Sequence, residues 1–335
     1  MRSLTDSWTL GGCRIPNRVV LAPLAGIGNW FVRLQARRHG AGLVVSEMIS
    51  SFGLKHGNER TLREFLRVHP DEHPISMQLF GHDADVMREA AAMVAAAGAD
   101  VIDLNMGCPV RKVCKTGAGA ALLDDPDRAV AIARAAREGG GLPVTVKLRP
   151  GQRPGERNGV ALAQRLVAEA GVAGIAFHPR HASQQHKGSA DYALASELVE
   201  ALEVPVMVSG GLSSDELARE AFERTGAEAV MLARGSLGNP WRFERLLGRR
   251  SGEPSLEEVA AELAWVIDRC EEHLGVERAG RYLRKFYPWY AERLRIGNEL
   301  DRALASAPTT DVARTLLAQI TGRASAPAGA RPLAA

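Results

Sequence analysis

One cysteine of this chain stands where a thiol can react. Residues 101–109 read VIDLNMGCP, a short alternating apolar run that Gly107 and Pro109 bring to an end, with Cys108 between them. The alternation predicts a strand, and the glycine and proline predict that the strand stops there. A free cysteine is often only a small buried hydrophobe. At the start of a loop, in contrast, the Cys108 thiol is presented to a ligand.

The chain around Cys108 alternates between strand and helix patterns. Apolar runs typical of strands occupy eight ranges: 19–22, 43–46, 75–79, 101–105, 144–148, 174–178, 205–209 and 229–233. Helical patterns lie at residues 29–39, 86–97, 124–138, 160–170, 193–202 and 214–224. Because strands that alternate with helices pair in parallel, the sequence predicts an α/β protein with a (β/α)8 TIM barrel. An open doubly wound sheet is the alternative, but the sequence lacks the G-x-G-x-x-G turn that favours it.

Polar residues and glycines end most of the predicted strands. These ends carry Pro23, Glu47, Gln78, Asn105, Lys147, His178, the run 209–211 and the pair 234–235. In this fold, ligands bind at the carboxyl ends of the strands. Any one of these residues could be an ordinary strand end. Together, amides, an ammonium and an imidazole at inward strand ends indicate a ligand that satisfies their hydrogen bonds.

Glycine turns and an arginine follow the last two predicted strands. Residues 209–211 read Ser-Gly-Gly, and residues 233–236 read Ala-Arg-Gly-Ser. Glycines let backbone N–H groups approach a phosphate, and Arg234 would add charge-assisted donors. Gln78, Asn105 and Lys147 offer donors and acceptors to a planar heteroaromatic ring, and a lysine beside a flavin favours its anionic reduced form. Flavin mononucleotide (FMN) fits all of these features.

Length and composition limit the class of protein. The chain has 335 residues, 46% of them hydrophobic, which suits one large domain and a smaller one. No apolar run approaches the roughly 18 to 20 residues of a membrane span, and the N-terminus lacks a signal-peptide pattern, so we expect a cytoplasmic protein. Its four cysteines are scattered, so neither a disulfide framework nor a metal site is expected. A net charge of +3 is too mild to indicate nucleic-acid binding alone.

The motifs along this chain resemble those of the tRNA-dihydrouridine synthases, and among them the bacterial B-type branch. They are the runs 22–26 (APLAG), 45–48 (VSEM), 105–109 (NMGCP) with Lys112 and Val113, 147–149 (KLR) and 178–180 (HPR), together with Gln78. The match extends in order from about residue 14 to residue 320. The resemblance implies an FMN enzyme that uses NADPH to reduce selected uridines of tRNA to 5,6-dihydrouridine.

The resemblance also implies roles for single residues. Cys108 would be the general acid at C5 of the uracil, while the flavin N5 delivers hydride to C6. Lys147 and His178 would hold the flavin, and Arg180 would approach the base or the flavin. The candidate cofactor-binding residues are Pro23, Leu24, Ala25, Gln78, Asn105, Lys147, His178, Ser209, Gly210, Gly211, Ala233 and Arg234. The chain departs from the family in the cofactor region at Ser209-Gly210-Gly211, where Asn-Gly is usual, at Ala233, where glycine is usual, and at Pro179, where glycine is frequent.

The cations of the Cys108 loop bear on its chemistry. Reduction of a conjugated C5=C6 bond needs hydride at one carbon and a proton at the other, so Cys108 must be protonated. Nearby cations lower the pKa of a thiol. We therefore expect Arg111, Lys112 and Lys115 to turn toward RNA phosphates instead. Gly117 and Gly119 predict that this loop moves and becomes ordered when substrate binds. Cys114 is a second thiol in the same loop.

Two other functions remain possible at this point. The first is an FMN barrel that oxidises or reduces a free pyrimidine such as dihydroorotate, where a loop Cys or Ser performs the reverse proton transfer. The second is an RNA-binding protein that keeps a barrel without catalysis, which would be colourless near about 450 nm because it would hold no flavin. An enzyme that acts on a free pyrimidine needs no segment after residue 250. The presence of this segment therefore favours an RNA substrate over the first alternative.

The segment after the barrel predicts a helical RNA-binding domain. We expect residues 1–245 to form the FMN-binding barrel, 250–321 a small helical bundle, and 322–335, rich in Ala, Pro and Gly, a disordered tail. The apolar helix positions are Val259, Leu263, Val266, Ile267, Cys270, Leu283, Phe286, Tyr290, Leu294, Val312, Leu316, Leu317 and Ile320.

A basic stretch lies within that bundle. Residues 277–295 hold six Arg or Lys against two Glu, with Tyr282, Tyr287, Trp289 and Tyr290 interleaved. A solvated basic face over an aromatic core is the plain alternative. Because a folded RNA is far larger than the mouth of a barrel, we expect Arg281, Arg284 and Lys285 to contact the tRNA backbone. The candidate substrate-binding residues are thus Arg180, Arg111, Lys112, Lys115, Arg281, Arg284 and Lys285, and the sequence indicates no obligate protein partner and no membrane.

Overall fold

A computed structural model describes residues 2–295 and 297–324 of the chain. The chain divides into two compact units. The first, which we call the barrel unit, runs to Gly235 and also includes residues 242–249. The second, the helical unit, includes residues 236–241 and the chain from Arg250 onward.

Eight parallel strands close the barrel unit. They are β3 (Val19–Leu21), β4 (Leu43–Val45), β6 (Ile75–Phe80), β7 (Val101–Met106), β8 (Val144–Leu148), β9 (Gly174–Phe177), β10 (Val206–Ser209) and β11 (Ala229–Leu232). Each pairs with the next along the chain, and β11 returns to β3 with Met231 opposite Val20. The predicted (β/α)8 barrel is confirmed.

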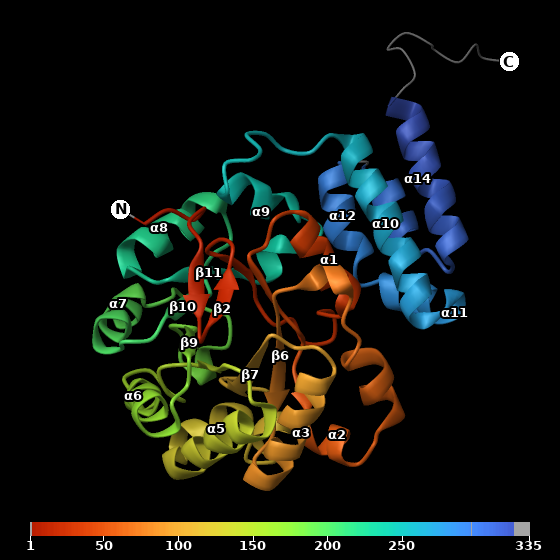
Figure 1. Cartoon of the computed structure of the whole chain (residues 1–335). Helices are drawn as coiled ribbons and strands as arrows, with labels where there is room; N and C mark the ends of the chain where they lie inside the picture. The colour runs from red at the N-terminus through yellow and green to blue at the C-terminus, as the bar shows by residue number, and fades with distance from the viewer. Residues whose placement is uncertain (1, 296, 325–335) are drawn as a thin grey trace, which may run out of the picture. The chain divides into compact units, whose positions relative to one another are not determined.

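Helices surround these strands, as Figure 1 shows for α3, α5, α6, α7 and α8. Their bounds are α1 (Trp30–Arg38), α3 (Ala84–Ala96), α5 (Pro126–Gly140), α6 (Asn158–Ala170), α7 (Tyr192–Ala201) and α8 (Asp215–Thr225), and α9 (Trp241–Leu246) follows β11. Local sequence fixes their ends. For example, the Asp125 side chain caps α5 by accepting from the Arg128 N–H, Pro126 opens the helix, and Gly141 ends it at φ +62°.

The alternation of β7 sorts its side chains between two faces. Val101 belongs to an apolar cluster inside the barrel with Val20, Leu43 and Met231. Since side chains two residues apart share a face, Asp103 and Asn105 also point inward, nearer the carboxyl end of the strand. The strand therefore carries polar groups from the core toward the barrel mouth.

A hairpin at the N-terminus was not predicted. β1 (Trp8–Leu10) pairs antiparallel with β2 (Cys13–Ile15) through Gly11 and Gly12, which have φ of +55° and +93°. Trp8, Leu10 and Ile15 join the cluster inside the barrel, so the chain before β3 contributes to the core. Each strand of this hairpin has a polar residue at its centre, whereas the equally short β3 and β4 are continuous apolar runs that the sequence reveals.

Further short elements lie in two connections. Between β4 and β6 are β5 (Ile49–Ser50), α2 (Ser51–Lys55), a π-helix (Thr61–Phe65) and a 3-10 helix (Pro70–Glu72). An ion pair between the buried side chains of Arg33 and Glu72, 2.5 Å apart, ties that 3-10 helix to α1. After β7 come α4 (Arg111–Cys114) and a 3-10 helix (Gly119–Asp124), which form the Cys108 loop.

The helical unit contains α10 (Leu256–Leu274), α11 (Val276–Leu283), α12 (Tyr287–Leu294), α13 (Asn298–Ala305) and α14 (Thr310–Ala324). Most of the apolar positions predicted for its core are buried, but Val312 is 39% exposed. On α14 the buried stripe is Ala313, Leu317 and Ile320, so the predicted face was rotated toward Val312. Helix α14 includes residues 322–324 of the expected tail, and residues 325–335 lie outside the described chain.

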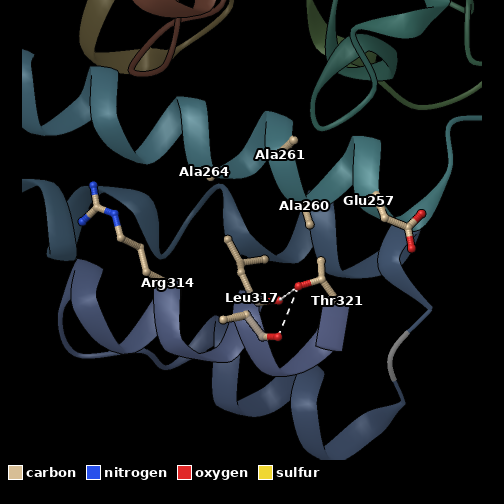
Figure 2. A pocket seen from close by; sticks show the side chains of 8 residues that line it. Glu257, Ala260, Ala261, Ala264, Arg314, Leu317 and Thr321 are labelled. Carbon is tan, nitrogen blue, oxygen red and sulfur yellow. Dashed lines mark hydrogen bonds between the residues drawn. The ribbon is translucent and has the colours of Figure 1, made fainter. Parts of the chain in front are cut away.

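A shallow apolar cavity of about 330 Å³ lies between α10 and α14 (Figure 2). Helix α10 lines the cavity with the small side chains of Ala260, Ala261 and Ala264, and α14 contributes Leu317. At one end, Arg314 pairs with Glu271 and with Asp268, 2.6 Å away. The alanines leave space between two helices that the Arg314 ion pairs hold together.

Candidate active site

Hydrogen bonds to its backbone fix Cys108 just beyond the end of β7. Its N–H donates to Oδ1 of Asn105 at 2.9 Å, and its carbonyl oxygen accepts from the Ala120 N–H at 3.0 Å. The Cys114 thiol also donates to this carbonyl, at a sulfur to oxygen distance of 3.3 Å. The Cys108 side chain is half-buried. The loop therefore presents this thiol in a defined place at the barrel mouth.

Burial, not the loop cations, dominates the acidity of this thiol. Desolvation raises the pKa of Cys108 above its ordinary value of 9.0, and the smaller opposing effects come from Val110, Arg149 and Lys147. Arg111, Lys112 and Lys115 are exposed and form no ion pair with a residue that the structure describes. These cations are not among the groups that shift the pKa of Cys108, and burial keeps Cys108 a neutral thiol at pH 7. That they turn toward RNA phosphates stays a prediction.

Two predicted site residues meet beneath Cys108. The Asn105 amide donates to Oε1 of Gln78 at 2.9 Å, and Gln78 donates to Oδ2 of Asp103 at 2.6 Å. Thr145 donates to the other oxygen of Asp103, also at 2.6 Å. Burial raises the pKa of Asp103 to about 6 despite these two donors and the charge of Lys147. Asp103 was not predicted as a site residue, although a carboxylate inside a barrel strand is a signal that could have singled it out.

The Lys147 ammonium has N–H groups that donate to none of the described residues. Its ammonium donates to Oγ of Ser209 at 3.1 Å, the one hydrogen bond it makes to the described residues. Desolvation, followed by the charge of Arg149, lowers the pKa of Lys147 to about 8. An ammonium carries three N–H groups, so a ligand with acceptor atoms fits beside it.

His178 and Gly210 come together at the ends of β9 and β10. A Cβ at Gly210, whose φ is +88°, would lie 2.3 Å from the His178 ring, so this turn needs glycine. Burial strongly lowers the pKa of His178, and the charges of Lys147, Arg149 and Arg180 add to the effect. The imidazole is therefore neutral, and its Nε2 accepts from Nη1 of Arg180 at 3.3 Å.

Arg149 is a functional candidate to which the sequence assigned no role. Its Nε donates to the Gly107 carbonyl at 2.9 Å, and its Nη1 donates to the carbonyls of Arg180 and Gln185 at 3.0 and 3.1 Å. This buried side chain thus joins the loop of Cys108 to the loop that follows His178. Its position directly after Lys147 and Leu148, at a strand end, is the signal that was available in the sequence.

The remaining predicted cofactor residues lie at the ends of β3 and β11. Leu24 is buried and Ala25 is exposed after β3, where the Gly26 N–H donates to the buried Glu47 carboxylate at 2.6 Å. Ala233 and Arg234 follow β11, and Arg234 is exposed, with no ion pair among the described residues. Ser209 is the last residue of β10, Gly211 lies just beyond it, and Pro23 follows β3. Among the described residues, no group of three or more His, Cys, Asp or Glu could hold a metal ion.

The helical unit displays the predicted basic residues. Arg281, Arg284 and Lys285 are exposed, at the end of α11 and just after it. The Lys285 ammonium lies 3.6 Å from the centroid of the Tyr282 ring. Tyr287 and Tyr290, in contrast, are buried in the core of this unit. The aromatic stretch is therefore divided, with half of its rings serving the core.

The chain is similar to known proteins over most of its length. The family described as "Dihydrouridine synthase (Dus)" matches residues 20–324. The tRNA-dihydrouridine synthase B of Pseudomonas aeruginosa is 36% identical over 290 residues, 85% of this chain and 87% of that one. A probable tRNA-dihydrouridine synthase of Rhodobacter capsulatus is 35% identical over 323 residues, 93% of this chain and 98% of that one.

Solved structures share the barrel. The old yellow enzyme homologue of Zymomonas mobilis superposes with a TM-score of 0.57 at 16% identity and covers 77% of this chain and 96% of its own. Morphinone reductase in complex with tetrahydroNAD gives a TM-score of 0.53 at 17% identity, with coverage of 77% and 94%. At such identities the likeness establishes the fold alone.

Together, these features define an oxidoreductase built on a (β/α)8 barrel. More specifically, the chain belongs to the dihydrouridine synthase family. The resemblance inferred from its motifs is confirmed. Among the described residues, no helix is long and apolar enough to span a membrane.

Proposed function

We propose that this protein reduces uridine in tRNA to 5,6-dihydrouridine, with Cys108 as the acid. The placement of Cys108 carries the proposal, because its half-buried thiol stands at the carboxyl end of β7 with its backbone held by Asn105. Burial raises the pKa of this thiol, so it has a proton to give. The relatives described as tRNA-dihydrouridine synthases support tRNA as the substrate.

We propose FMN as the cofactor and NADPH as its reductant. The unused N–H groups of Lys147 and the exposed Arg234 fit a ring with acceptors and a phosphate, respectively. The residues that would hold FMN are Pro23, Leu24, Ala25, Gln78, Asn105, Lys147, His178, Ser209, Gly210, Gly211, Ala233 and Arg234. FMN supplies the hydride that one carbon of the uracil C5=C6 bond receives.

The side chains supply the proton and the surrounding polarity. Cys108 gives its proton to C5 of the uracil, and the resulting thiolate regains a proton from solvent. The positive charge of Lys147 stabilises negative charge that develops at the mouth. Arg180 approaches the base, since the neutral His178 accepts one of its hydrogen bonds and leaves the guanidinium charge uncompensated there.

Two sets of exposed cations suit the phosphates of a folded RNA. In the barrel unit, Arg111, Lys112 and Lys115 lie on the Cys108 loop and form no ion pair with described residues. In the helical unit, which we propose binds tRNA through residues 250–321, the set is Arg281, Arg284 and Lys285. The pair of Arg281 with Glu277, at 3.6 Å, is so exposed that it competes weakly with phosphate.

A nucleoside assay tests this function. The purified protein, FMN and NADPH are incubated with tRNA from a strain that lacks the gene, and the digested tRNA is analysed by mass spectrometry. The proposal requires that specific uridines gain two hydrogens. Turnover of orotate or dihydroorotate without change in tRNA would instead indicate a free-pyrimidine dehydrogenase. A protein that binds tRNA but no flavin, and modifies nothing, would indicate an RNA-binding role.

A further inference from the structure

A buried carboxylate lies beneath the candidate site with no role assigned to it so far. Asp103 is 2% exposed and stands on β7 two residues before Asn105. Its Oδ1 accepts from Thr145 and its Oδ2 accepts from Gln78, both at 2.6 Å. Both oxygens are thus engaged by donors from the neighbouring strands β8 and β6, which surround the carboxylate.

This carboxylate sets the direction of two amides. An ionised carboxylate can only accept hydrogen bonds, so the Gln78 amide must turn its NH2 toward Asp103 and its oxygen toward Asn105. Asn105 must then donate to Gln78, which leaves its own oxygen for the Cys108 N–H at 2.9 Å and the Gly107 N–H at 3.3 Å. If the amides were reversed, the NH2 group of Asn105 would face two N–H donors.

We infer that Asp103 is a positioning residue that acts through Gln78 and Asn105 to hold the backbone of Cys108. It touches neither the thiol nor the mouth of the barrel. Its effect on the reaction rests on the proposed function, whereas its effect on the Cys108 loop does not.

The electrostatic setting supports this role. Burying a carboxylate costs free energy, and an apolar side chain of similar volume would pack in a barrel core at lower cost. The pKa of Asp103, about 6, still leaves it ionised at pH 7, and the charged group facing it is Lys147 of β8. A carboxylate retained inside the barrel at this cost supports a role for Asp103 in positioning the residues of the candidate active site.

Alkylation of single cysteines tests the inference in the holoprotein. The rate of modification by iodoacetamide is measured by mass spectrometry for Cys108 and, as an internal control, for Cys13, which is also half-buried but lies in the N-terminal hairpin. The variants are Asp103→Leu, which removes the acceptor, and Asp103→Asn, which retains one oxygen. The matched control is Thr145→Val. It removes the hydrogen bond that Thr145 donates to Asp103 but leaves the hydrogen bonds that connect Asp103 to Cys108 through Gln78 and Asn105.

Asp103→Leu is expected to speed alkylation of Cys108 by about fivefold or more without changing Cys13, because the loop opens locally. Asp103→Asn and Thr145→Val are each expected to stay within about twofold of wild type, since Gln78 keeps its acceptor. If Asp103→Leu does not fold, the double variant Asp103→Asn with Thr145→Val takes its place. In this double variant the amide that replaces the Asp103 carboxylate no longer has the Thr145 hydroxyl to orient it. The rate of Cys108 alkylation must therefore exceed the rates in both single variants.

Three results would overturn the inference: unchanged Cys108 reactivity in Asp103→Leu, an equal rise in Thr145→Val, or a parallel rise at Cys13, which would show general loosening. A second readout follows single-turnover formation of dihydrouridine. Asp103→Leu is expected to lose about tenfold when the rate is expressed per bound flavin, with rescue by Asp103→Asn. If wild type forms no dihydrouridine while the alkylation pattern holds, the proposed function fails and the positioning role stands.

Discussion

The guanidinium of Arg149 donates to the carbonyl oxygen of Gly107, 2.9 Å away, and so fixes the residue before Cys108. The same side chain reaches the carbonyls of Arg180, His181 and Gln185 in the loop after β9. The buried guanidinium of Arg149 thus connects two loops. One carries Cys108, the proposed acid, and the other carries Arg180, which we propose binds the base. We expect these loops to lose their order together when Arg149 is removed.

Arg149→Met should lower the free energy of unfolding by about 2 to 4 kcal/mol, because several buried carbonyls lose their donor. Dihydrouridine formation should fall at least about tenfold through misplacement of Cys108. Urea denaturation and the nucleoside assay measure the two effects. Arg153→Met is the control, since Arg153 is an exposed arginine in the same connection after β8. Equal effects of the two variants would contradict the role of Arg149.

Cys108→Ala should keep its flavin and still be reduced by NADPH, but should lose about 100-fold or more in dihydrouridine formation because the proton donor is gone. Single-turnover assays with tRNA measure this loss. Cys114→Ala is the matched control and should lose no more than about threefold, since its thiol makes one weak hydrogen bond to the Cys108 carbonyl. A Cys108→Ala variant with nearly normal turnover would make Cys108 a structural residue.

The protonation of Cys108 predicts a pH profile. Since burial raises its pKa above 9.0, the thiol is mostly protonated at pH 7 to 8, and the midpoint of its ionisation lies above pH 9. Ionisation of Cys108 should therefore reduce the single-turnover rate only above pH 9. Loss of the charge of Lys147, whose pKa is about 8, should reduce the rate at lower pH than this. The pH dependence of Cys108 alkylation by iodoacetamide isolates the thiol from Lys147. A midpoint below pH 8, in wild type and in Cys114→Ala, would show that the exposed loop cations govern the thiol after all.

Gly210→Ala should destabilise the barrel unit more than a positive φ alone explains, since the new Cβ would lie 2.3 Å from the His178 ring. The matched control is Gly12→Ala, whose φ is +93° but whose Cβ would meet nothing within 4 Å. The control should cost about 1 to 3 kcal/mol, and Gly210→Ala should exceed it and weaken FMN retention. Thermal melts and flavin content after dialysis measure both effects. Equal losses would show that His178 can move aside freely.

Replacing Arg281, Arg284 and Lys285 together by Ala should weaken tRNA binding and flatten its salt dependence by about two to three phosphate contacts, while FMN content and NADPH oxidation stay normal. Filter binding across salt concentrations measures the slope. A triple variant at Arg134, Arg165 and Arg224 of the barrel helices changes the charge equally and serves as the control. An unchanged slope in the first variant would confine the RNA contacts to the Cys108 loop.

The repeated strand and helix patterns were enough to predict the barrel, because its strands are buried on both faces and its helices start at recognisable caps. The same reasoning located the strand ends that carry Gln78, Asn105, Lys147 and His178. It failed for the short N-terminal hairpin, whose Trp8 and Ile15 are too few to form a pattern.

The chemistry of the site was harder to predict than its location. The acidity of Cys108 depends on how much of the thiol is desolvated, and burial is a property of the tertiary structure. Likewise, Asp103 and Gln78 lie on different strands, so their hydrogen bond follows from strand register, with Gln78 opposite Asp103. A linear sequence shows neither quantity.

The pairing of β3 with β11 has a consequence for biosynthesis. Val20 emerges from the ribosome long before Met231, its partner in the closed barrel. Until then β3 and the last completed strand are open edges, and open edges invite pairing with other chains. The Cys108 loop also lies between these two strands in the sequence, so its thiol is made before the barrel can close around it. Nascent chains that stop before β11 should therefore depend on chaperones, whereas chains that include it can complete the sheet unaided.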